Sequence, residues 1–353
     1  MTSDSQGSRL QFLLPAAGLV VLVLVFVVLH LFRADDASPL ERGVAWLAAH
    51  QQADGSWRGE EIAVLRPGPA MTAFVLYAMT RMPGFEPAER LDRAARYLES
   101  QINADGIVGM TSDGPDYPNY ATSLTVLSFV ALNRQTSVTR MVDYLKRAQL
   151  DETEGWAPTD PEYGGWAFGG PPQPKPSAHR LDISMTRFAL EALAAAKVPA
   201  DDAVWSKARR FLQACQNGDG GFIFTPLAEQ NKAGGRVSYG TATADGALAL
   251  RALGGPQDRL QLAENWIRTR FTAEHCPGFP PDHPRPWAES LLGYWLAASS
   301  RIADTPGKAW IAHVLARRQR ADGSWANPAD AMLENEPLLA TALAVLALTE
   351  SSR

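Results

Sequence analysis

The hydrophobic positions of this chain form helix-like stretches of two alternating kinds. In the first kind, apolar residues lie on one face at helical spacing, as with Val44, Leu47 and Ala48, and polar residues cover the rest. In the second kind, apolar residues lie on most sides, as from Thr72 to Tyr77. Because a helix that is apolar nearly all round is buried, the pattern predicts outer helices packed around inner ones.

The two kinds of helix recur together as one repeating unit. The first copy has an aromatic–Leu pair, Trp46-Leu47, then Gln51, and then a turn that contains Gly55 and Trp57. Closer or looser copies follow at residues 97–106, 144–156, 211–222, 266–279 and 314–325. A unit that recurs at this length builds an array by stacking.

The inner helices align on one column of the repeat. The column holds a threonine in most copies and Glu289 in the fifth; the threonines are Thr72, Thr122, Thr186, Thr243 and Thr341. We expect these hydroxyls to bond backbone carbonyls. Six such hairpins can close into a ring, which has no ends to cap. We therefore predict an all-α fold, an (α/α)6 barrel over residues 39–353, with no strand pattern of note.

The turns between the helices carry two further expectations. Gln51, Gln216 and Gln319 are expected to bond backbone groups at helix ends, which otherwise lack partners. The aromatic residues of the turns are expected to pack between neighbouring hairpins; they are Trp57, Trp156, Phe222, Phe279 and Trp325.

The N-terminus carries a long apolar run. Phe12 to Leu29 is eighteen residues without a charge, which is near the length that crosses a bilayer. A secretory signal peptide is the alternative, but no good cleavage site follows the run. We predict a tail (1–10), a transmembrane anchor (11–33), a linker (34–38) and a membrane location with the lipid bilayer as partner. Arg9 and Arg33 flank the run, so the side of the membrane stays open.

Charge and cysteine content narrow the function classes. The 353 residues have a net charge of -5, so there is no basic footprint and no nucleic-acid partner is expected. Cys215 and Cys276 are the only cysteines. Two cysteines make neither a disulfide framework nor a four-ligand zinc site.

The repeat resembles the QW motif of squalene–hopene cyclases and their relatives in the terpenoid cyclase and protein prenyltransferase toroid family. Tyr163-Gly164-Gly165-Trp166 and Asp219-Gly220-Gly221-Phe222 also resemble segments of bacterial cyclase-like proteins. The resemblance implies a central cavity that binds or converts an isoprenoid or other hydrophobic small molecule. The chain fits one barrel, as in a prenyltransferase β subunit, whereas squalene cyclases have two.

The chain departs from the family's catalytic motifs. Class II cyclases protonate an alkene with an Asp-x-Asp-Asp motif, and here adjacent aspartates occur only at Asp35-Asp36 and Asp201-Asp202. Prenyltransferases bind zinc through Asp, Cys and His. Cys276 has His275 beside it and His283 nearby but no matching Asp. We therefore expect no metal and no cofactor, and whether the protein is an enzyme stays open.

Three acidic residues are the candidate catalytic groups. Asp245 stands in a column that elsewhere holds apolar residues, namely Phe74, Leu124, Phe188, Leu291 and Leu343. It is either an acid in the cavity or a helix-end residue that reaches water. Glu289 either faces the same cavity or bonds Arg285. Asp182, four residues before Thr186, is either a cavity acid or an N-cap.

Four aromatic residues are candidates for the wall of a ligand pocket. Tyr163, Trp166, Tyr239 and Trp287 could stabilise a cation through their rings, and core packing is the alternative. Glu334 and Glu336 are expected to be solvated.

Three functions therefore remain open. The first is a cyclase-like or prenyltransferase-like protein acting on an isoprenoid. The second is a non-catalytic toroid that binds lipid or protein. The third is a carbohydrate-active (α/α)6 enzyme, which needs two carboxylates across the cavity; Asp245 with Glu289 or Asp182 are the pairs to test.

Overall fold

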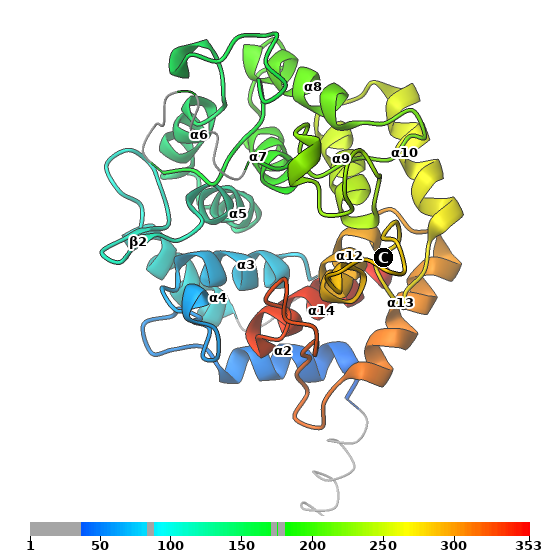
Figure 1. The fold of residues 1–353 in the computed structure, drawn as a ribbon. Helices are drawn as coiled ribbons and strands as arrows, with labels where there is room; N and C mark the ends of the chain where they lie inside the picture. Colours follow the sequence, from blue (N-terminus) through cyan, green and yellow to red (C-terminus); the bar gives the residue numbers. More distant parts are fainter. Residues whose placement is uncertain (1–36, 83–87, 171–174, 176–180) are drawn as a thin grey trace, which may run out of the picture.

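The computed structural model describes residues 37–82, 88–170, 175 and 181–353. In this part of the chain, outer helices alternate with inner helices to form six hairpins (Figure 1). The outer helices are α2 (Pro39–Ala49), α4 (Ala88–Ser100), α6 (Val138–Arg147), α8 (Ala203–Cys215), α10 (Gln257–Arg270) and α13 (Thr305–Arg318). The inner helices are α3 (Pro69–Thr80), α5 (Pro118–Ala131), α7 (Ile183–Ala195), α9 (Gly240–Ala252), α12 (Leu292–Ser299), which follows the short α11 (Trp287–Ser290), and α14 (Pro337–Ser351).

The inner helices form a closed ring. Each contacts the next in chain order, and α14 packs against α3 and α2, so the last hairpin meets the first. Figure 1 shows the inner ring surrounded by the outer helices. The predicted all-α toroid is confirmed. The described residues add short 3-10 turns (Ala63–Leu65, Glu152–Glu154, Ala228–Gln230), one small hairpin, in which β1 (Met110–Thr111) pairs antiparallel with β2 (Gly114–Pro115), and isolated β-bridges between Gln149 and Trp166 and between Gln216 and Phe222.

Burial follows the two hydrophobic patterns. In α9 every residue from Gly240 to Leu250 is buried. In the outer helix α6 only one stripe is buried, formed by Val138, Met141, Tyr144 and Leu145. This difference confirms the assignment of inner and outer layers, because a surface helix buries a stripe and an enclosed helix buries its whole circumference.

The repeat glutamines join each hairpin to the next. Gln51 Nε2 donates to the Gly55 carbonyl at 3.0 Å in its own turn and to the Arg90 carbonyl at 2.9 Å in the next outer helix. Gln319 donates in the same way to Gly323 and Pro39, and so closes the ring. The other copies of the contact are Gln149 with Gly164 and Val204, and Gln216 with Gly220 and Arg259. The expected bonds to backbone groups near helix ends are confirmed, but the acceptors in the helices are carbonyls of the first turn and not the N–H groups that a helix start leaves unpaired.

The repeat threonines hold the turn aromatics in place. The Trp57 backbone N–H donates to Thr72 Oγ1 at 2.9 Å, and its indole N–H donates to the Leu47 carbonyl at 2.7 Å. The backbone bond recurs in four other copies, between Val108 and Thr122, Trp166 and Thr186, Phe222 and Thr243, and Trp325 and Thr341. The threonine hydroxyl therefore also accepts a bond, which the sequence pattern did not predict.

The assignment of Trp156 to the third turn was wrong. Trp166 occupies that position, because its backbone N–H bonds Thr186 and its indole N–H donates to the Leu145 carbonyl at 2.7 Å. Residues 150–163 are an insertion before this turn. Trp156 belongs to the insertion and lies next to Lys175, whose Nζ is 5.4 Å from the Trp156 ring centroid.

The expected membrane location is not supported and is corrected here. No helix among the described residues is long and apolar enough to cross a membrane. The tail, the predicted anchor at 11–33 and most of the linker lie outside the described residues. The described chain begins with a capped helix, since Ser38 and Glu41 form a capping box at the start of α2.

Candidate functional site inside the ring

A buried ion pair joins two inner helices. Arg187 Nη1 on α7 lies 3.0 Å from Asp245 Oδ1 on α9. The Tyr294 hydroxyl on α12 donates to the same carboxyl group, at 3.0 Å to Oδ1 and 3.2 Å to Oδ2. Asp245 is 2% exposed, so the alternative of a helix-end residue that reaches water was wrong. Burial raises the pKa of Asp245, and Arg187 and Tyr294 oppose that rise.

The ion pair extends into a network of four charges. Glu191 Oε1 lies 3.3 Å from Arg187 Nε and 2.7 Å from Arg301 Nη1. Arg187 therefore bridges two carboxylates, and the two arginines balance Asp245 and Glu191. A buried charge is tolerated when it is paired in this way. The network fixes the position of Asp245 from both sides.

Asp182 lies at the start of α7. Its Oδ1 accepts the Met185 N–H at 2.7 Å, which makes it the N-cap, one of the two roles considered for it. It is also buried. Burial raises its pKa to about 7, the charge of Lys232 and the bond from Met185 act against this rise, and the nearby Asp245 adds to it.

Lys232 is a member of the site that the sequence analysis missed. It follows the 3-10 turn Ala228–Gln230 and is half-buried. Its Nζ lies 3.0 Å from the ring centroid of Phe224 and 6.0 Å from that of Trp287. Burial lowers its pKa to about 8, and the charges of Asp182 and Asp245 oppose the fall. We call Asp182, Arg187, Glu191, Lys232, Asp245, Tyr294 and Arg301 the central cluster.

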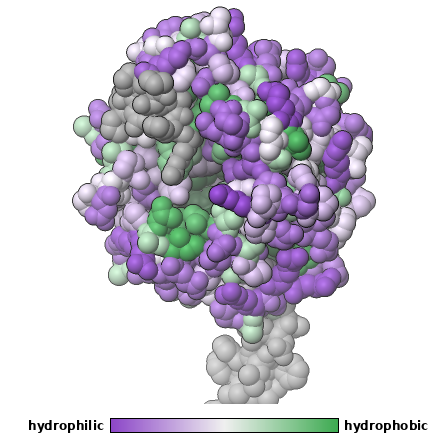
Figure 2. Space-filling view, viewed as in Figure 1, coloured by the Kyte–Doolittle hydropathy of each residue, from purple (hydrophilic) through white to green (hydrophobic). Residues whose placement is uncertain are grey.

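Aromatic side chains pack beside the central cluster. Phe188 on α7 contacts Tyr120 and Tyr77 edge to face, with centroid distances of 5.6 and 6.0 Å. The Tyr294 hydroxyl also bonds Ser184 Oγ. Tyr120 and Tyr294 are partly exposed, although most residues of the inner helices are buried. Solvent therefore reaches the cluster, and Figure 2 shows a hollow near the middle of the ring on its visible face.

Buried acids bond the N-terminal ends of two inner helices from other segments. Glu334 accepts the N–H groups of Gly293 and Tyr294 at 2.7 and 2.9 Å, and burial raises its pKa to about 7. Asp116 accepts the Ala70 N–H at 2.9 Å, and burial raises its pKa to about 6. These carboxyls satisfy amide groups that the helices leave unpaired. We call these helix starts, together with the central cluster, the mouth.

Glu334 and Glu336 are not solvated, contrary to expectation. Each is 2% exposed. Glu336 Oε2 accepts the N–H groups of Glu61 and Ile62 at 3.0 and 3.1 Å. Glu336 therefore joins the last hairpin to the loop of the first, as a closed ring requires.

Glu289 does not join the central cluster. It belongs to α11 and is exposed, and its backbone carbonyl accepts a bond from Asn327 Nδ2 at 2.6 Å. The inner helix of this hairpin is interrupted at Leu291, so the column that aligned Glu289 with the threonines is not continuous. Asp245 and Asp182 are the candidate acids that the structure brings together.

The four candidate aromatic residues fall in different places. Trp287 lies beside Lys232 at the mouth. Tyr239 is the buried N-cap residue of α9 and packs on Phe279 at 4.8 Å. Tyr163 donates its hydroxyl to Glu152 Oε1 at 2.7 Å, and Trp166 is the turn aromatic of the third hairpin. Of the four, Trp287 is the best placed to contact a bound ligand.

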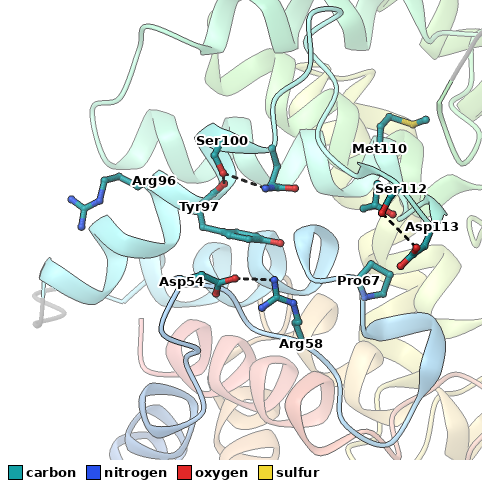
Figure 3. A pocket seen from close by; sticks show the side chains of 11 residues that line it. Asp54, Arg58, Pro67, Arg96, Tyr97, Ser100, Met110, Ser112 and Asp113 are labelled. Carbon is teal, nitrogen blue, oxygen red and sulfur yellow. Dashed lines mark hydrogen bonds and ion pairs between the residues drawn. The ribbon is translucent and has the colours of Figure 1, made fainter.

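A separate cavity of about 670 Å³ lies between the first two hairpins (Figure 3). Tyr97 and Arg58 lie next to each other in its wall, with the guanidinium carbon 5.6 Å from the ring centroid, and Met110 and Asp113 of the β hairpin form another wall. Arg58 pairs with Asp54 at 2.8 Å. Because those charges satisfy each other, the central cluster is the better candidate for chemistry. Among the described residues no group of three or more His, Cys, Asp or Glu side chains could hold a metal ion.

The model of the A-macroglobulin TED domain family matches residues 19–253, which is more than half of the chain. The chain belongs to this family. A segment of 74 residues, 21% of the chain, is 38% identical to drimenyl diphosphate synthase of Streptomyces showdoensis, and the match takes in 14% of that synthase. The chain thus matches only a small part of the synthase.

Solved structures share the whole ring. A protein from Actinoplanes is 18% identical, with a TM-score of 0.64 over 89% of this chain and 99% of its own. A variant of the type II terpene cyclase MstE from Scytonema, in complex with geranylgeranyl dihydroxybenzoate, is 16% identical, with a TM-score of 0.62 over 89% and 96%. A glycosidase is 14% identical, with a TM-score of 0.56 over 89% and 97%. The resemblance to the terpenoid cyclase toroid is confirmed at the level of fold.

Proposed function

We propose that the protein binds an isoprenoid or similarly apolar molecule at the mouth of the ring and converts it by proton transfer from Asp182. The observation that carries the proposal is a buried carboxyl group with a pKa of about 7 beside a second carboxyl group, Asp245. An acid that keeps its proton at neutral pH can deliver it to a substrate that water does not protonate.

Asp182 and Asp245 have different environments. Asp245 receives hydrogen bonds from Arg187 and Tyr294, which favour its ionised form. No ion pair among the described residues includes Asp182; burial raises its pKa, the charge of Lys232 opposes the rise, and Asp245 adds to it. Asp182 Oδ1 accepts the Met185 N–H. Asp182 is therefore the proton donor, and Asp245 helps it to hold the proton.

The aromatic residues support the same reaction class. Protonation of an alkene leaves a carbocation, and the faces of aromatic rings attract cations. Tyr120, Phe188 and Trp287 lie on different elements around the cluster. MstE binds a geranylgeranyl compound in a ring of the same fold, which supports an isoprenoid guest here.

The test is a reaction in heavy water with geranylgeranyl dihydroxybenzoate and a panel of polyprenyl compounds. Cyclisation adds a proton from the enzyme to one alkene and removes another proton at the end, so the product is an isomer of the substrate that carries one deuterium. Asp182→Asn should lower the rate by about 100-fold or more. The wild-type rate should fall as the pH rises through about 7, because Asp182 loses its proton there.

The matched control is Asp304→Asn. Asp304 caps the outer helix α13 through the Gly307 N–H at 3.0 Å, so the control removes the same kind of cap away from the ring's interior. It should keep full activity. An Asp182→Asn variant that is as active as the wild type, or a product without deuterium, would refute the proposal.

A glycosidase is the second candidate, because the interior is polar and carries two acids, and a glycosidase shares the fold. Hydrolysis of a glycoside needs one carboxyl as acid and another as base or nucleophile. A panel of nitrophenyl glycosides tests this function. Release of nitrophenol that both Asp182→Asn and Asp245→Asn abolish would favour it over the first.

A further inference from the structure

The repeat places a pocket between the turn of one hairpin and the outer helix of the next. The cavity at Arg58 and Tyr97 is one example, between the first two hairpins and beside the turn acid Asp54. A second cavity, of about 420 Å³, lies in the equivalent place between the turn of the fourth hairpin and α10. Its walls include the turn acid Asp219 and Trp266, which stands where Tyr97 does in the repeat. We call this second cavity the turn pocket.

The two cavities differ in how the arginine over the aromatic ring is neutralised. In the first cavity, Arg58 lies over the Tyr97 ring and pairs with Asp54 at 2.8 Å. In the turn pocket, the guanidinium carbon of Arg270 lies 4.9 Å from the ring centroid of Trp266. No ion pair among the described residues includes Arg270. The turn pocket therefore has the stacked arginine of the first cavity without its carboxylate partner.

The turn acid of the turn pocket bonds neutral groups instead of an arginine. The indole N–H of Trp266 donates to Asp219 Oδ2 at 2.9 Å. The Ser238 hydroxyl and the Gly221 N–H donate to Oδ1 at 2.9 and 3.0 Å. Asp219 therefore holds the turn to the outer helix, and the arginine beside it stays without a carboxylate.

A second arginine adds to the positive charge of the turn pocket. Arg236 lines the pocket, and its Nη2 donates to the Ala214 carbonyl at 3.0 Å. Its backbone is fixed, because the Arg236 carbonyl accepts Asn217 Nδ2 at 2.7 Å. Like Arg270, it belongs to no ion pair of the described residues. Two arginines and one aspartate leave one positive charge in excess in the lining, whereas two arginines and two aspartates line the first cavity.

We infer that the turn pocket binds a small organic anion, a carboxylate or a phosphate monoester with an apolar substituent. A guanidinium group binds either anion through two parallel hydrogen bonds, and Arg236 and Arg270 supply two such groups. A cavity of about 420 Å³ is large enough for such a molecule. Val237, which is 43% exposed in the wall of the pocket, supplies the apolar contact. The pocket lies between a turn and an outer helix, so this site is independent of the proposed function.

The experiment compares ligands that share a phenyl ring and differ in charge. NMR titration of the full chain follows the indole N–H signal of Trp266, assigned with Trp266→Phe, as phenylacetate, phenyl phosphate or neutral phenylacetamide is added. Phenylacetate should bind at least about tenfold more tightly than phenylacetamide, as one charge-assisted contact allows. The preference should weaken at high salt, because both arginines are exposed. The affinities of phenylacetate and phenyl phosphate distinguish a carboxylate site from a phosphate site.

Four variants isolate the charges of the turn pocket. Arg236→Met and Arg270→Met should each weaken binding of the anions by about tenfold and leave binding of phenylacetamide unchanged. Asp219→Asn should tighten binding of the anions, because it removes the negative charge from the lining. This effect is opposite in sign to the effect of damage to the pocket. Arg58→Met, in the first cavity, is the matched control and should bind the ligands as the wild type does.

Several results would overturn the inference. They are equal affinity for the anions and phenylacetamide, a Trp266 signal that neither anion moves, and an unchanged affinity for the anions in both Arg236→Met and Arg270→Met. Weaker binding of the anions in Asp219→Asn would also contradict it, provided that the melting curve of the variant matches that of the wild type. Melting curves of the other variants show that they are folded. None of these results bears on proton transfer from Asp182, which the reaction in heavy water tests separately.

Discussion

The outer turns and the mouth of the ring differ in which contacts recur. In the turns, one glutamine joins a hairpin to the next through backbone carbonyls, and one threonine bonds a backbone N–H, and both contacts return around the ring. At the mouth, Asp182, Lys232 and Asp245 each occur in one hairpin alone, and their neighbours come from different hairpins.

This difference separates the contacts that close the ring from the residues that form the candidate site. The turn contacts use backbone atoms, which every residue provides, so a copy works even where Val108 replaces the aromatic. The mouth depends on particular side chains. Asp245 stands where four other copies have Phe74, Leu124, Phe188 and Leu343, and it is stable there because α7 supplies Arg187. Loss of the repeat pattern therefore marks the candidate site.

Among the substitutions considered, Arg187→Met should lower the stability of the central cluster most. The variant leaves Asp245 and Glu191 without their shared cation inside the ring, and we expect a loss of about 3–5 kcal/mol in the free energy of unfolding. Urea denaturation measures it. Arg96→Met is the control, because Arg96 pairs with Asp92 on the surface and its side chain is 59% exposed, so less than about 1 kcal/mol should be lost. Equal losses in the two variants would contradict a structural role for the network.

Glu334→Gln tests a buried acid of the mouth through the pH dependence of the free energy of unfolding. The folded pKa of Glu334 is about 7 and its ordinary value is 4.5. Between these values the folded state binds more protons at this group than the unfolded state does, so its contribution to stability falls as the pH rises. Gln does not titrate. The stability of the wild type relative to the variant should therefore fall by about 3 kcal/mol from pH 4.5 to 7.5.

Thermal melts of both proteins across that pH range test this prediction. Gln resembles protonated Glu in shape and can still accept one N–H bond at the start of α12, so the two proteins should be most alike at low pH. A stability difference that does not change with pH would show that Glu334 stays ionised, held by the Gly293 and Tyr294 amides.

The sequence predicts the ring and its turns because both depend on periodic, local signals. Helix periodicity identifies the layers, and the spacing of Gln51 and Gly55 is the same in the copies at Gln216 and Gln319. The third copy was misaligned because an insertion precedes Trp166, and a nearby Gly-Trp pair at Trp156 imitates the turn. When the Gly-Trp pair that ends the repeat occurs twice, the alignment of the repeats does not show that an insertion lies before the second pair.

The mouth was only partly predictable. Asp245 was found because a charged residue interrupts an apolar column, but its partner Arg187 is 58 positions away in the chain. Lys232 lies in a loop without periodicity, so no pattern marks it. Glu289 was misplaced because the alignment assumed one continuous helix, whereas the chain breaks into α11 and α12 at Leu291. Pairings between hairpins depend on how the ring closes, which a linear pattern does not encode.

The smallest effect is expected at a single turn contact, and two buried threonines of α14 provide a matched test. Thr341 Oγ1 accepts the Trp325 N–H at 3.0 Å, so Thr341→Val leaves a buried donor unpaired and should cost about 1–2 kcal/mol in unfolding free energy. Thr349 is equally buried, and its hydroxyl has no hydrogen-bond partner among the described residues. Thr349→Val should therefore be neutral or slightly stabilising, since it removes an unsatisfied polar group of the same size. Urea denaturation of both variants decides the matter. If the two substitutions cost the same, the threonine column serves helix packing alone, and the backbone bond that recurs around the ring adds nothing to its stability.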